Sequence, residues 1–499
     1  MTAELLARLG GPVAAGGLAL LVLASPRPAR LAGLALWAAG MALFVPVLAP
    51  SGHVGLLVAG GILAVAGAAV LAVVFRWQPW ALALLALAAA PARVPVAVGE
   101  VSASLLVPLY AVVAGAALAL GWSLWRDAGR RRELGVLSWP LALFVLWLGL
   151  SALWTNDPEE AALQLFFFVV PFALLTVALA RLPWSDSGLA WLSGLLGAMA
   201  LLFGGVGLWQ WATRDIFWNP KVIEDNAYAP FFRVNSLFWD PSIYGRFLVV
   251  TILVALVFLL FGRWRRLDAP LVLLIAGLWA ALLFSFSQSS FAALVVGIVL
   301  AAVLAWRWRA AVAVGLVAAV MIPVGVAAPQ LENVRDSVVS TSGDGLDRAT
   351  GGRFELVSKG VRIAADHPLV GVGVGGFEEA YTERVEGPRR FDEPASHNVV
   401  VTMAAETGVV GLVLFAWLVA AAFVVAFRRT RAAPRPVRIA GLVAGIGLFA
   451  VFVHGLFYDA FLEDPLVWVF FALAALAARE STPAEGAPPA ARATASGRR

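Results

Sequence analysis

The sequence predicts an all-α protein, a polytopic bundle of transmembrane helices with a helical external loop. Of its 499 residues, 61% are hydrophobic and only 13% are charged, a composition typical of a polytopic membrane protein. The apolar residues fall in long blocks, many of which reach or approach the roughly 20 residues that a spanning helix needs. Short connections that carry arginine separate the blocks. Together these observations predict a multi-pass membrane protein.

About fifteen apolar blocks are long enough, or nearly so, to cross a bilayer. The block at 79–92 is short, so it is expected either to span or to be re-entrant. The blocks lie near 11–26, 31–49, 54–75, 79–92, 102–125, 136–154, 161–180, 188–212, 241–262, 268–286, 290–306, 309–328, 398–427, 437–457 and 463–478.

The arginines predict the orientation of these helices, because positive charge in short loops stays on the cytoplasmic side. Two predicted spans separate each neighbouring pair of basic clusters, as a consistent topology requires. The loops between them, including "TNDPEE" at 155–160 and "DAFLED" at 459–464, are acidic or neutral and fall outside. The basic clusters contain Arg27, Arg30, Arg76, Arg126, Arg130, Arg131, Arg132, Arg181, Arg263, Arg265, Arg266, Arg307, Arg309, Arg428, Arg429, Arg431, Arg435 and Arg438.

The chain divides into five regions by composition. The last of them is rich in Ala, Pro, Gly and Ser without apolar periodicity, which predicts a disordered cytoplasmic tail. The regions are N-terminal transmembrane helices with a first external loop at 1–230, further transmembrane helices at 231–329, an external helical loop at 330–396, C-terminal transmembrane helices at 397–478, and the tail at 479–499.

Charge and cysteine content exclude several classes of function. The net charge of +5 is spread over short turns that membrane topology already explains, so no nucleic-acid partner is expected. With no cysteine and only four histidines, the chain has no disulfide framework, and a zinc site is not favoured. We therefore expect no metal and no cofactor.

The external loop contains its own helical pattern. In "RFELVSKGVRIAADHP", the apolar residues Phe354, Val357, Val361 and Ala364 recur at helical spacing and predict one amphipathic helix. The proline ends this helix because the residue before proline avoids the helical region. "FEEAYTERV" predicts a second short helix, and Ser396 is a candidate N-cap for the next span. Between the two helices, Gly371, Gly373 and Gly376 match a dinucleotide-binding spacing, but no βαβ unit surrounds them, so a tight turn is favoured.

Two polar residues stand out at the start of the span near 398–427. His397 opens the helix, where the helix dipole disfavours the imidazolium and keeps the ring neutral and able to accept a proton. The alternative is a capping or packing histidine. Glu406 lies further in, where burial of a carboxylate is costly unless it faces a cavity or a partner. The alternative is a glutamate near the lipid headgroups.

Arginines add an anion-binding character to the external side. Arg233 stands at the entrance of a span and Arg246 lies inside it, where it must meet an anion, a carbonyl or water. Arg353 opens the helix of the external loop. Snorkelling is the alternative for Arg233, and a solvated helix face for Arg353. Such arginines can hold a lipid-linked diphosphate while His397 takes a proton from an acceptor hydroxyl.

With these residues the chain resembles the O-antigen ligase and polymerase superfamily of bacterial envelope glycosyltransferases. The resemblance covers roughly residues 231–425. Its most specific part is an arginine-led helix and a glycine turn, followed by His-Asn and Glu-x-Gly at the next membrane helix. The motifs are "RVNSLFWDPSIYGRFL", "FSFSQSSFAALVVG" and "GGRFELVSKGVRIAADHPLVGVGVGGF" leading into "SHNVVVTMAAETGVVGL".

The resemblance implies a GT-C-like enzyme of the bacterial inner membrane. It would transfer a glycan from an undecaprenyl diphosphate carrier to a glycan or lipid acceptor, at an external active site and without a metal. His397 would be the catalytic base, Arg233 and Arg353 would bind the diphosphate, and Glu406 would sit in the same pocket. Gln288 stands where family members often carry arginine; it can hydrogen-bond an anion without neutralising it, and Arg246 is a candidate substitute.

Three functions remain open from the sequence. A ligase and a repeat-unit polymerase of the same superfamily would use the same residues. A transporter or flippase of lipid-linked oligosaccharides would place polar residues near the bilayer midplane, whereas here they gather at the external boundary. Ligase-like transfer is therefore the favoured interpretation.

Overall fold

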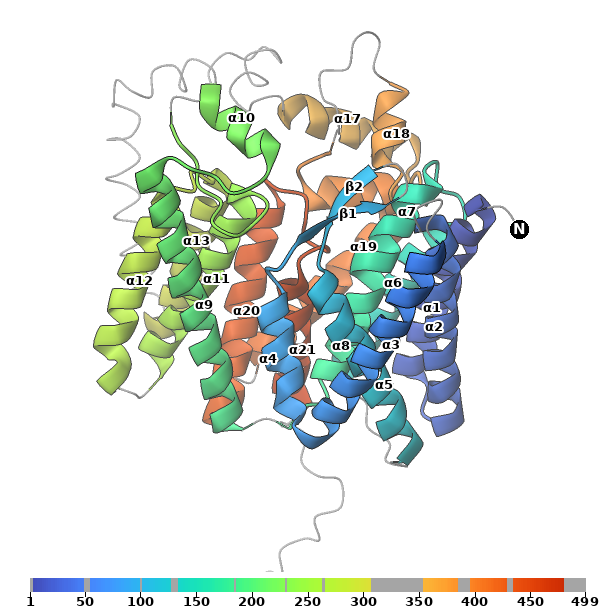
Figure 1. Ribbon diagram of the computed structural model, residues 1–499, viewed down its shortest axis with the longest axis horizontal. Coiled ribbons are helices and arrows are strands. Elements are labelled where there is room, and N and C mark those ends of the chain that lie inside the picture. The colour runs from blue at the N-terminus through green and yellow to red at the C-terminus, as the bar shows by residue number, and fades with distance from the viewer. Residues whose placement is uncertain are drawn as a thin grey trace, which may run out of the picture.

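The structure is a computed structural model, shown in Figure 1. The predicted span at 309–328 lies outside the described residues, and so does the predicted tail at 479–499 except for Arg479, which ends α21. The structure describes residues 3–48, 54–98, 101–126, 133–183, 185–228, 231–262, 265–306, 353–384, 395–428 and 434–479.

The predicted all-α membrane fold is confirmed. Within the described ranges, ten helices are long and apolar enough to cross a membrane, and four shorter apolar helices accompany them. The helices of the bundle are α1 (Ala3–Leu23), α2 (Arg27–Leu48), α3 (Val54–Trp77), α4 (Pro79–Ala89), α5 (Val107–Arg126), α6 (Ser138–Ser151), α7 (Pro158–Gln164), α8 (Val170–Leu179), α9 (Asp186–Thr213), α11 (Pro241–Phe261), α12 (Asp268–Leu283), α13 (Gln288–Trp306), α19 (Val399–Arg428), α20 (Arg435–Gly455) and α21 (Pro465–Arg479).

A small hairpin interrupts the helical pattern and corrects one predicted span. Strand β1 (Val94–Val98) pairs antiparallel with β2 (Val101–Leu105), with Val94 opposite Leu105. The span predicted from residue 102 therefore begins only at Val107, in α5. Valine suits a strand as well as a membrane helix, so the apolar composition of this segment did not distinguish the two. The hairpin lies at the same end of the bundle as α7 (Figure 1).

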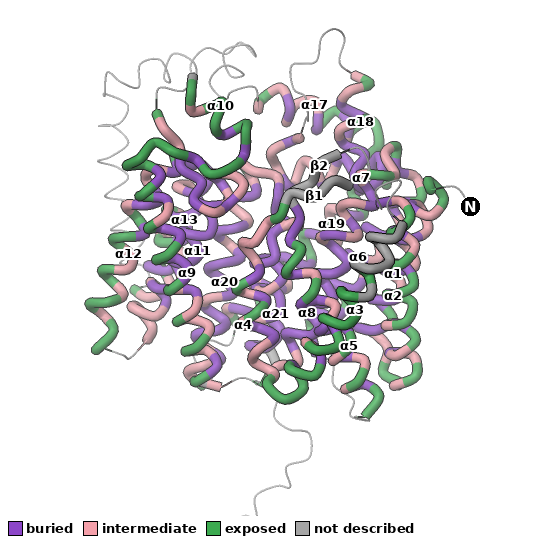
Figure 2. The backbone as a smooth tube through the Cα atoms, in the orientation of Figure 1, coloured by how far each residue is buried: buried purple, intermediate pink, exposed green. Residues whose placement is uncertain are grey.

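Two hydrophobic cores hold the bundle together, and α20 belongs to both. One core joins α1, α2, α5, α6, α8, α19 and α21, and Leu448 of α20 packs into it. The other joins α9, α11, α12 and α13, and Ile446 of α20 packs into that one. Figure 2 shows the buried backbone concentrated through this central part. Because α20 packs into both cores, it joins the two halves of the bundle.

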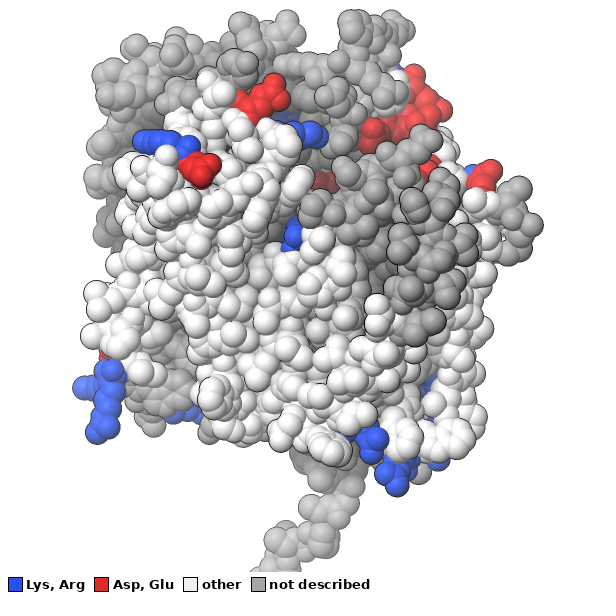
Figure 3. Space-filling view, in the orientation of Figure 1, with Lys and Arg blue, Asp and Glu red and all other residues white. Residues whose placement is uncertain are grey.

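The two ends of the bundle differ in charge. The polar helices α10 (Pro220–Tyr228), α17 (Arg353–Asp366) and α18 (Phe377–Thr382) lie at one end with α7 (Figure 1). Figure 3 shows most of the visible carboxylates at that end, whereas mostly arginine and lysine mark the opposite one. This distribution matches the pattern from which the orientation is predicted.

Candidate functional site

Helix α17 lies at the polar end and packs against the start of α19. The helix is confirmed, but its buried face consists of Leu356, Gly360 and Ile363. The predicted apolar face was wrong: Phe354 and Val361 are exposed, and Val357 and Ala364 are only half-buried. A Cβ at Gly360 would touch Val401 of α19 and Phe377 of α18. The helix ends at Asp366, just before the sequence "HP", where the proline prevents continuation. Arg353 is the first residue of α17, at the opposite end of the helix from Asp366.

The glycine turn after α17 is a structural joint and not a dinucleotide site. Gly373 has φ 96°, and a Cβ on it would fall on the backbone of Thr155, so only glycine fits here. The next residue, Val374, is held on both sides: its N–H donates to Ser151 Oγ at 3.2 Å, and its carbonyl accepts from Thr155 Oγ1 at 2.8 Å. The turn is thereby fixed to the loop after α6.

A break in α19 explains the Glu-x-Gly motif. Gly408 has φ 64° and ψ −169° inside the helix, so the carbonyls of the preceding turn lose their helical partners. Other segments replace them. Val372 N donates to the carbonyl of Ala405 at 3.0 Å and Gly373 N to that of Glu406 at 2.8 Å, while Trp147 Nε1 donates to that of Thr407 at 3.0 Å. Glu406 is held at this fixed break.

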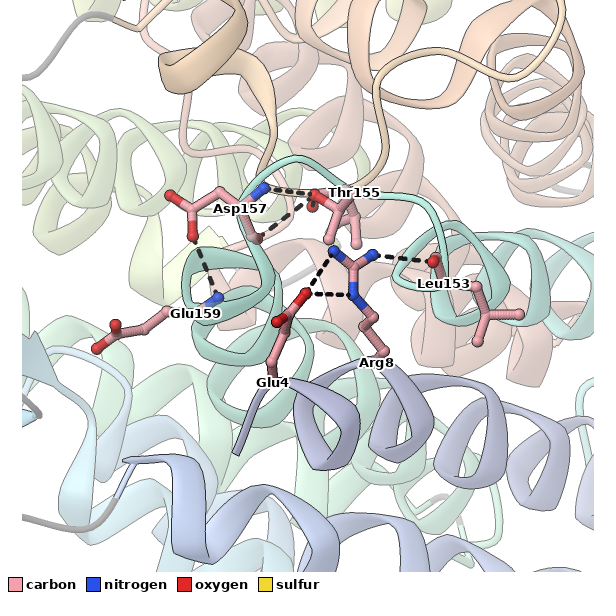
Figure 4. Close-up of polar contacts among 7 residues, drawn as sticks. Glu4, Arg8, Leu153, Thr155, Asp157 and Glu159 are labelled. Atoms are coloured by element: carbon pink, nitrogen blue, oxygen red, sulfur yellow. Dashed lines mark hydrogen bonds and ion pairs between the residues drawn. The ribbon is translucent and has the colours of Figure 1, made fainter. Parts of the chain in front are cut away.

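The start of α7 packs against the glycine turn and forms the next wall of the site (Figure 4). Asp157 caps the helix by accepting from the backbone N–H groups of Glu159 and Glu160, at 3.1 and 2.9 Å, as expected of an N-cap aspartate. Helix α1 supports the loop before it. Arg8 Nη1 donates to the carbonyl of Leu153 at 2.9 Å and its guanidinium pairs with Glu4.

The entry to α19 differs from the prediction that Ser396 caps it. Asn398 is the cap, because its Oδ1 accepts from Val400 N at 3.0 Å and Val401 N at 3.2 Å. Ser396 Oγ instead accepts from Asn398 N at 3.0 Å and bonds to Asp459 at 3.3 Å. Two side-chain turns so close together force His397 between them into the left-handed region, with φ 54°, which is uncommon outside glycine.

His397 interacts electrostatically with groups from two other segments. Burial lowers the pKa of the imidazole, the positive charge of Arg353 lowers this pKa further, and Asp240 opposes them. The ring is therefore held neutral near pH 7.

Arg353 links His397 to Arg233. Burial lowers the pKa of the Arg353 guanidinium, and the positive charge of Arg233 adds to this effect, while Asp240 opposes it. We call His397, Arg233, Arg353 and Asp240 the basic cluster. Three segments far apart in the chain, 231–240, the start of α17 and the loop before α19, build this cluster.

Arg233 is positioned through its backbone and its side chain. The side chain of Asn226, on α10, accepts from Arg233 N at 2.8 Å and donates to its carbonyl at 2.9 Å. Arg233 Nε donates to the carbonyl of Ser285 at 3.2 Å. Asp240 caps α11 by accepting from Ser242 N at 2.6 Å. Among the described residues, the hydrogen bond to Ser285 uses only Nε of the Arg233 guanidinium, and the other two nitrogens can donate to a ligand.

Arg246 does not join the basic cluster. It is 2% exposed and forms an ion pair with Asp464, with 2.6 Å between Nε and Oδ2. Its Nη1 donates to the carbonyl of Ala460 at 3.4 Å. The sequence required a partner for an arginine at this depth, and the structure provides a carboxylate from the loop before α21. Because Asp464 neutralises its charge, Arg246 is not among the residues that we assign to the anion site.

Glu406 also lies apart from the arginines, in contrast to the expected shared pocket. It is 2% exposed and interacts electrostatically with Asp459 and Glu160. It lines a cavity of about 630 Å³ that no arginine or histidine lines among the residues the structure places. The carboxylates on its wall are those of Asp157, Glu159, Glu160, Glu378, Glu406, Asp459 and Glu463. We call this space the acidic cavity.

Two carboxylates of the acidic cavity lie in the loop between α20 and α21. Burial raises the pKa of Asp459 to about 6, although a hydrogen bond from Thr402 opposes the shift. Burial also raises the pKa of Glu463, and Arg93 opposes this. Near neutral pH these groups are thus closer to protonation than free carboxylates, and protonated carboxyls both donate and accept hydrogen bonds.

Gln288 is exposed at the first residue of α13. The serines around it form a buried network: Ser287 Oγ bonds to Ser290 Oγ at 2.8 Å, and Ser289 Oγ bonds to His454 Nε2 at 3.0 Å. This network fixes the loop whose Ser285 carbonyl binds Arg233. Binding of an anion by Gln288 stays a prediction.

Residues 272–416 match the family model of the O-antigen ligases. The chain carries an O-antigen ligase family region. This supports the predicted superfamily and, at the level of class, a membrane protein with glycosyltransferase-like activity on lipid-linked glycans and their acceptors. The matched O-antigen ligase region contains Gln288, Arg353, His397 and Glu406, whereas Arg233 reaches the cluster from outside it. A comparison with curated proteins finds no match.

Proposed function

We propose that this protein transfers a glycan from an undecaprenyl diphosphate carrier to an acceptor hydroxyl, without a metal, with His397 as general base. A repeat-unit polymerase of the same superfamily is the second candidate, because the same residues would serve it. The family match over residues 272–416 supports the general class. Donor, base and sidedness are part of the proposal.

The observation that carries the proposal is the basic cluster. A neutral imidazole lies within electrostatic reach of Arg353, which in turn lies within reach of Arg233. Bringing guanidiniums together at a partly buried site is unfavourable unless an anion joins them. A diphosphate supplies the charge and the geometry that arginines bind best.

The chemistry follows from these positions. The acceptor oxygen forms a bond to the anomeric carbon while the bond from that carbon to the diphosphate oxygen breaks. His397 takes the acceptor proton. Arg233 and Arg353 stabilise the negative charge that grows on the leaving polyprenyl diphosphate. Since burial and Arg353 keep His397 neutral, its ring is ready to accept that proton at neutral pH.

The proposed sidedness rests on charge. The basic cluster belongs to the polar end of the bundle with α10, α17 and α18, and arginines mark the opposite end (Figures 1 and 3). Under the positive-inside rule the arginine-rich end is cytoplasmic. The active site therefore faces the external side of the inner membrane.

Substitution of His397 tests the proposal. A strain that lacks the endogenous gene would express the wild type, His397→Ala or His367→Ala, and envelope glycan would be analysed by gel and mass spectrometry. His367 is an exposed histidine at the end of α17 and serves as the matched control. We expect loss of product only with His397→Ala. Unchanged product would exclude the base role.

The missing product separates the two candidate functions. Loss of acceptor-linked glycan with normal chain length on the carrier indicates a ligase. Loss of chain length, with single repeat units remaining, indicates a polymerase.

A further inference from the structure

The basic cluster and the acidic cavity meet at two pairs of neighbouring residues. His397 belongs to the basic cluster, and Ser396 lines the acidic cavity. Tyr458 interacts electrostatically with Arg353, and Asp459 lines the cavity. Ser396 Oγ and Asp459 bond to each other at 3.3 Å. The cavity wall is thus one residue away from the candidate base.

Glu406 points to a ligand in the acidic cavity. Its side chain is buried, yet it lines the cavity, and within the part of the chain that the structure describes its Oε2 atom has no hydrogen-bond partner. The backbone N–H groups of Gly375 and Phe377 interact with the same carboxylate, so the unpartnered oxygen is fixed in place. A buried acceptor without a donor is costly. A hydrogen-bond donor on a ligand removes that cost.

The wall of the cavity selects the chemistry of that donor. Its carboxylates repel phosphate and carboxylate groups, whereas they accept hydrogen bonds from hydroxyls. Phe168, Phe377 and Phe461 add apolar faces to the lining. A volume of about 630 Å³ falls within the roughly 300–1,000 Å³ usual for small-molecule sites. An uncharged, hydroxyl-rich ligand with apolar C–H faces fits all three properties.

We propose that the acidic cavity is the acceptor subsite and binds the end of an uncharged saccharide, with Glu406 accepting a hydrogen bond from one of its hydroxyls. This inference rests on the proposed function, because it directs another hydroxyl of that saccharide past Ser396 toward His397. The two regions then bind the two substrates by opposite charge: the basic cluster holds the diphosphate donor, and the acidic cavity admits a neutral acceptor.

Binding by the purified full-length protein in detergent tests the subsite. Isothermal titration would use three probes: neutral tri-N-acetylchitotriose, anionic trigalacturonate and inorganic diphosphate. We expect the neutral trisaccharide to bind about tenfold more tightly than trigalacturonate, because carboxylates line the cavity. Glu406→Gln should weaken binding of the neutral trisaccharide about tenfold, as expected when one buried hydrogen bond is lost. It should leave diphosphate binding within about twofold.

Two further variants make the test specific. Leu163→Trp narrows the cavity from α7 without changing a carboxylate, so it should also weaken trisaccharide binding. Asp366→Asn changes an exposed carboxylate that pairs with Arg384 outside the cavity, so it should leave all three affinities unchanged. Thermal unfolding of each variant would confirm that it is folded.

Three results would overturn the subsite: no binding of the neutral trisaccharide, equal binding by wild type and both cavity variants, or tighter binding of trigalacturonate than of the neutral trisaccharide. These results leave the proposed function standing if His397→Ala still abolishes glycan transfer. Conversely, transfer by His397→Ala would reject the base role, while trisaccharide binding that depends on Glu406 would remain evidence for a saccharide site.

Discussion

The basic cluster and the acidic cavity lie side by side but solve opposite electrostatic problems. In the basic cluster, two guanidiniums lie within electrostatic reach of one another, while burial and the charge of Arg353 lower the pKa of His397 and keep its ring uncharged. In the acidic cavity, carboxylates crowd together and burial raises the pKa of Asp459 to about 6. Each region is unfavourable without a ligand of suitable chemistry. The comparison shows that residues only one or two positions apart in the chain belong to regions of opposite charge, which suit different ligands.

Backbone geometry maintains this separation. His397 has a left-handed φ of 54° and lies between Ser396, which lines the acidic cavity, and Asn398, which caps the start of α19. The loop after α20 places Tyr458 and Asp459 in the same alternating way. Irregular backbone between two spans is therefore what puts opposite charges on opposite sides.

The largest expected effect tests whether Arg246 belongs to the basic cluster. The structure pairs it with Asp464 in a buried ion pair, and removal of one partner of such a pair costs about 3–5 kcal/mol. Arg246→Met should therefore lower the midpoint of thermal unfolding strongly.

The exposed pair of Arg384 with Asp366 provides the control. Arg384→Met should cost about 0–1 kcal/mol. If Arg246→Met unfolds like the wild type but loses diphosphate binding, Arg246 belongs to the anion site after all, and the division between the two regions is wrong.

The next largest effect concerns catalysis. Arg353→Gln keeps hydrogen-bonding capacity but removes the positive charge, so glycan transfer should fall about 10²–10³-fold, as for loss of one group that stabilises a transition-state oxyanion. Binding of neutral trisaccharide should be unchanged. Initial rates with purified protein and isolated carrier-linked glycan would measure it.

Arg362→Gln is the matched control, since Arg362 lies exposed on the same helix. Equal rates for the two variants would show that the charge of Arg353 in the basic cluster is not needed for transfer. A loss of trisaccharide binding in Arg353→Gln would show that the two regions do not act separately.

The sequence predicted much of this arrangement because its signals are local. Apolar block length predicted the bundle, periodicity predicted α17, and the absence of a βαβ unit identified the glycine turn. The requirement that buried charge must find a partner correctly singled out Arg246 and Glu406. That requirement did not identify the partner of either residue. Asp464 and the acidic cavity come from loops far along the chain, so only the fold reveals them.

Other site features carried weak signals in the sequence. Asp240 directly precedes α11 and caps it, but its electrostatic interaction with His397 and Arg353 depends on tertiary packing. The carboxylates around Glu406 were visible as acidic loops and were used only for orientation. The hairpin at 94–105 was hidden because valine and alanine suit a membrane helix as well as a strand.

A smaller effect concerns the joint between the two regions. Gly373→Ala places a Cβ on Thr155 in a left-handed conformation, at an expected cost of about 1–3 kcal/mol. Because the turn builds the cavity wall through Val374 and Gly375, trisaccharide binding should weaken more than diphosphate binding. Thermal unfolding and titration would measure both.

A glycine with free space supplies the comparison for that variant. Gly194 lies within α9 with open space around its Cβ position, so Gly194→Ala should be neutral or stabilise by about 0.5–1 kcal/mol. If Gly373→Ala behaves like Gly194→Ala, the turn does not shape the cavity.

The smallest expected effect is a shift of the pH profile of glycan transfer. It distinguishes titration in the basic cluster from titration in the acidic cavity. Transfer requires neutral His397, so activity is lost as pH falls through the pKa of the ring, which burial and Arg353 hold below its ordinary value of about 6.5. Asp240 is the opposing charge; Asp240→Asn removes it, keeps a residue that can cap α11, and should move the acid limb to lower pH.

Asp459 has a pKa of about 6 and titrates nearby, so the profile would be repeated with Asp459→Asn. If the acid limb of the profile shifts with Asp459→Asn but not with Asp240→Asn, the titrating group lies in the acidic cavity, and His397 is rejected as the base.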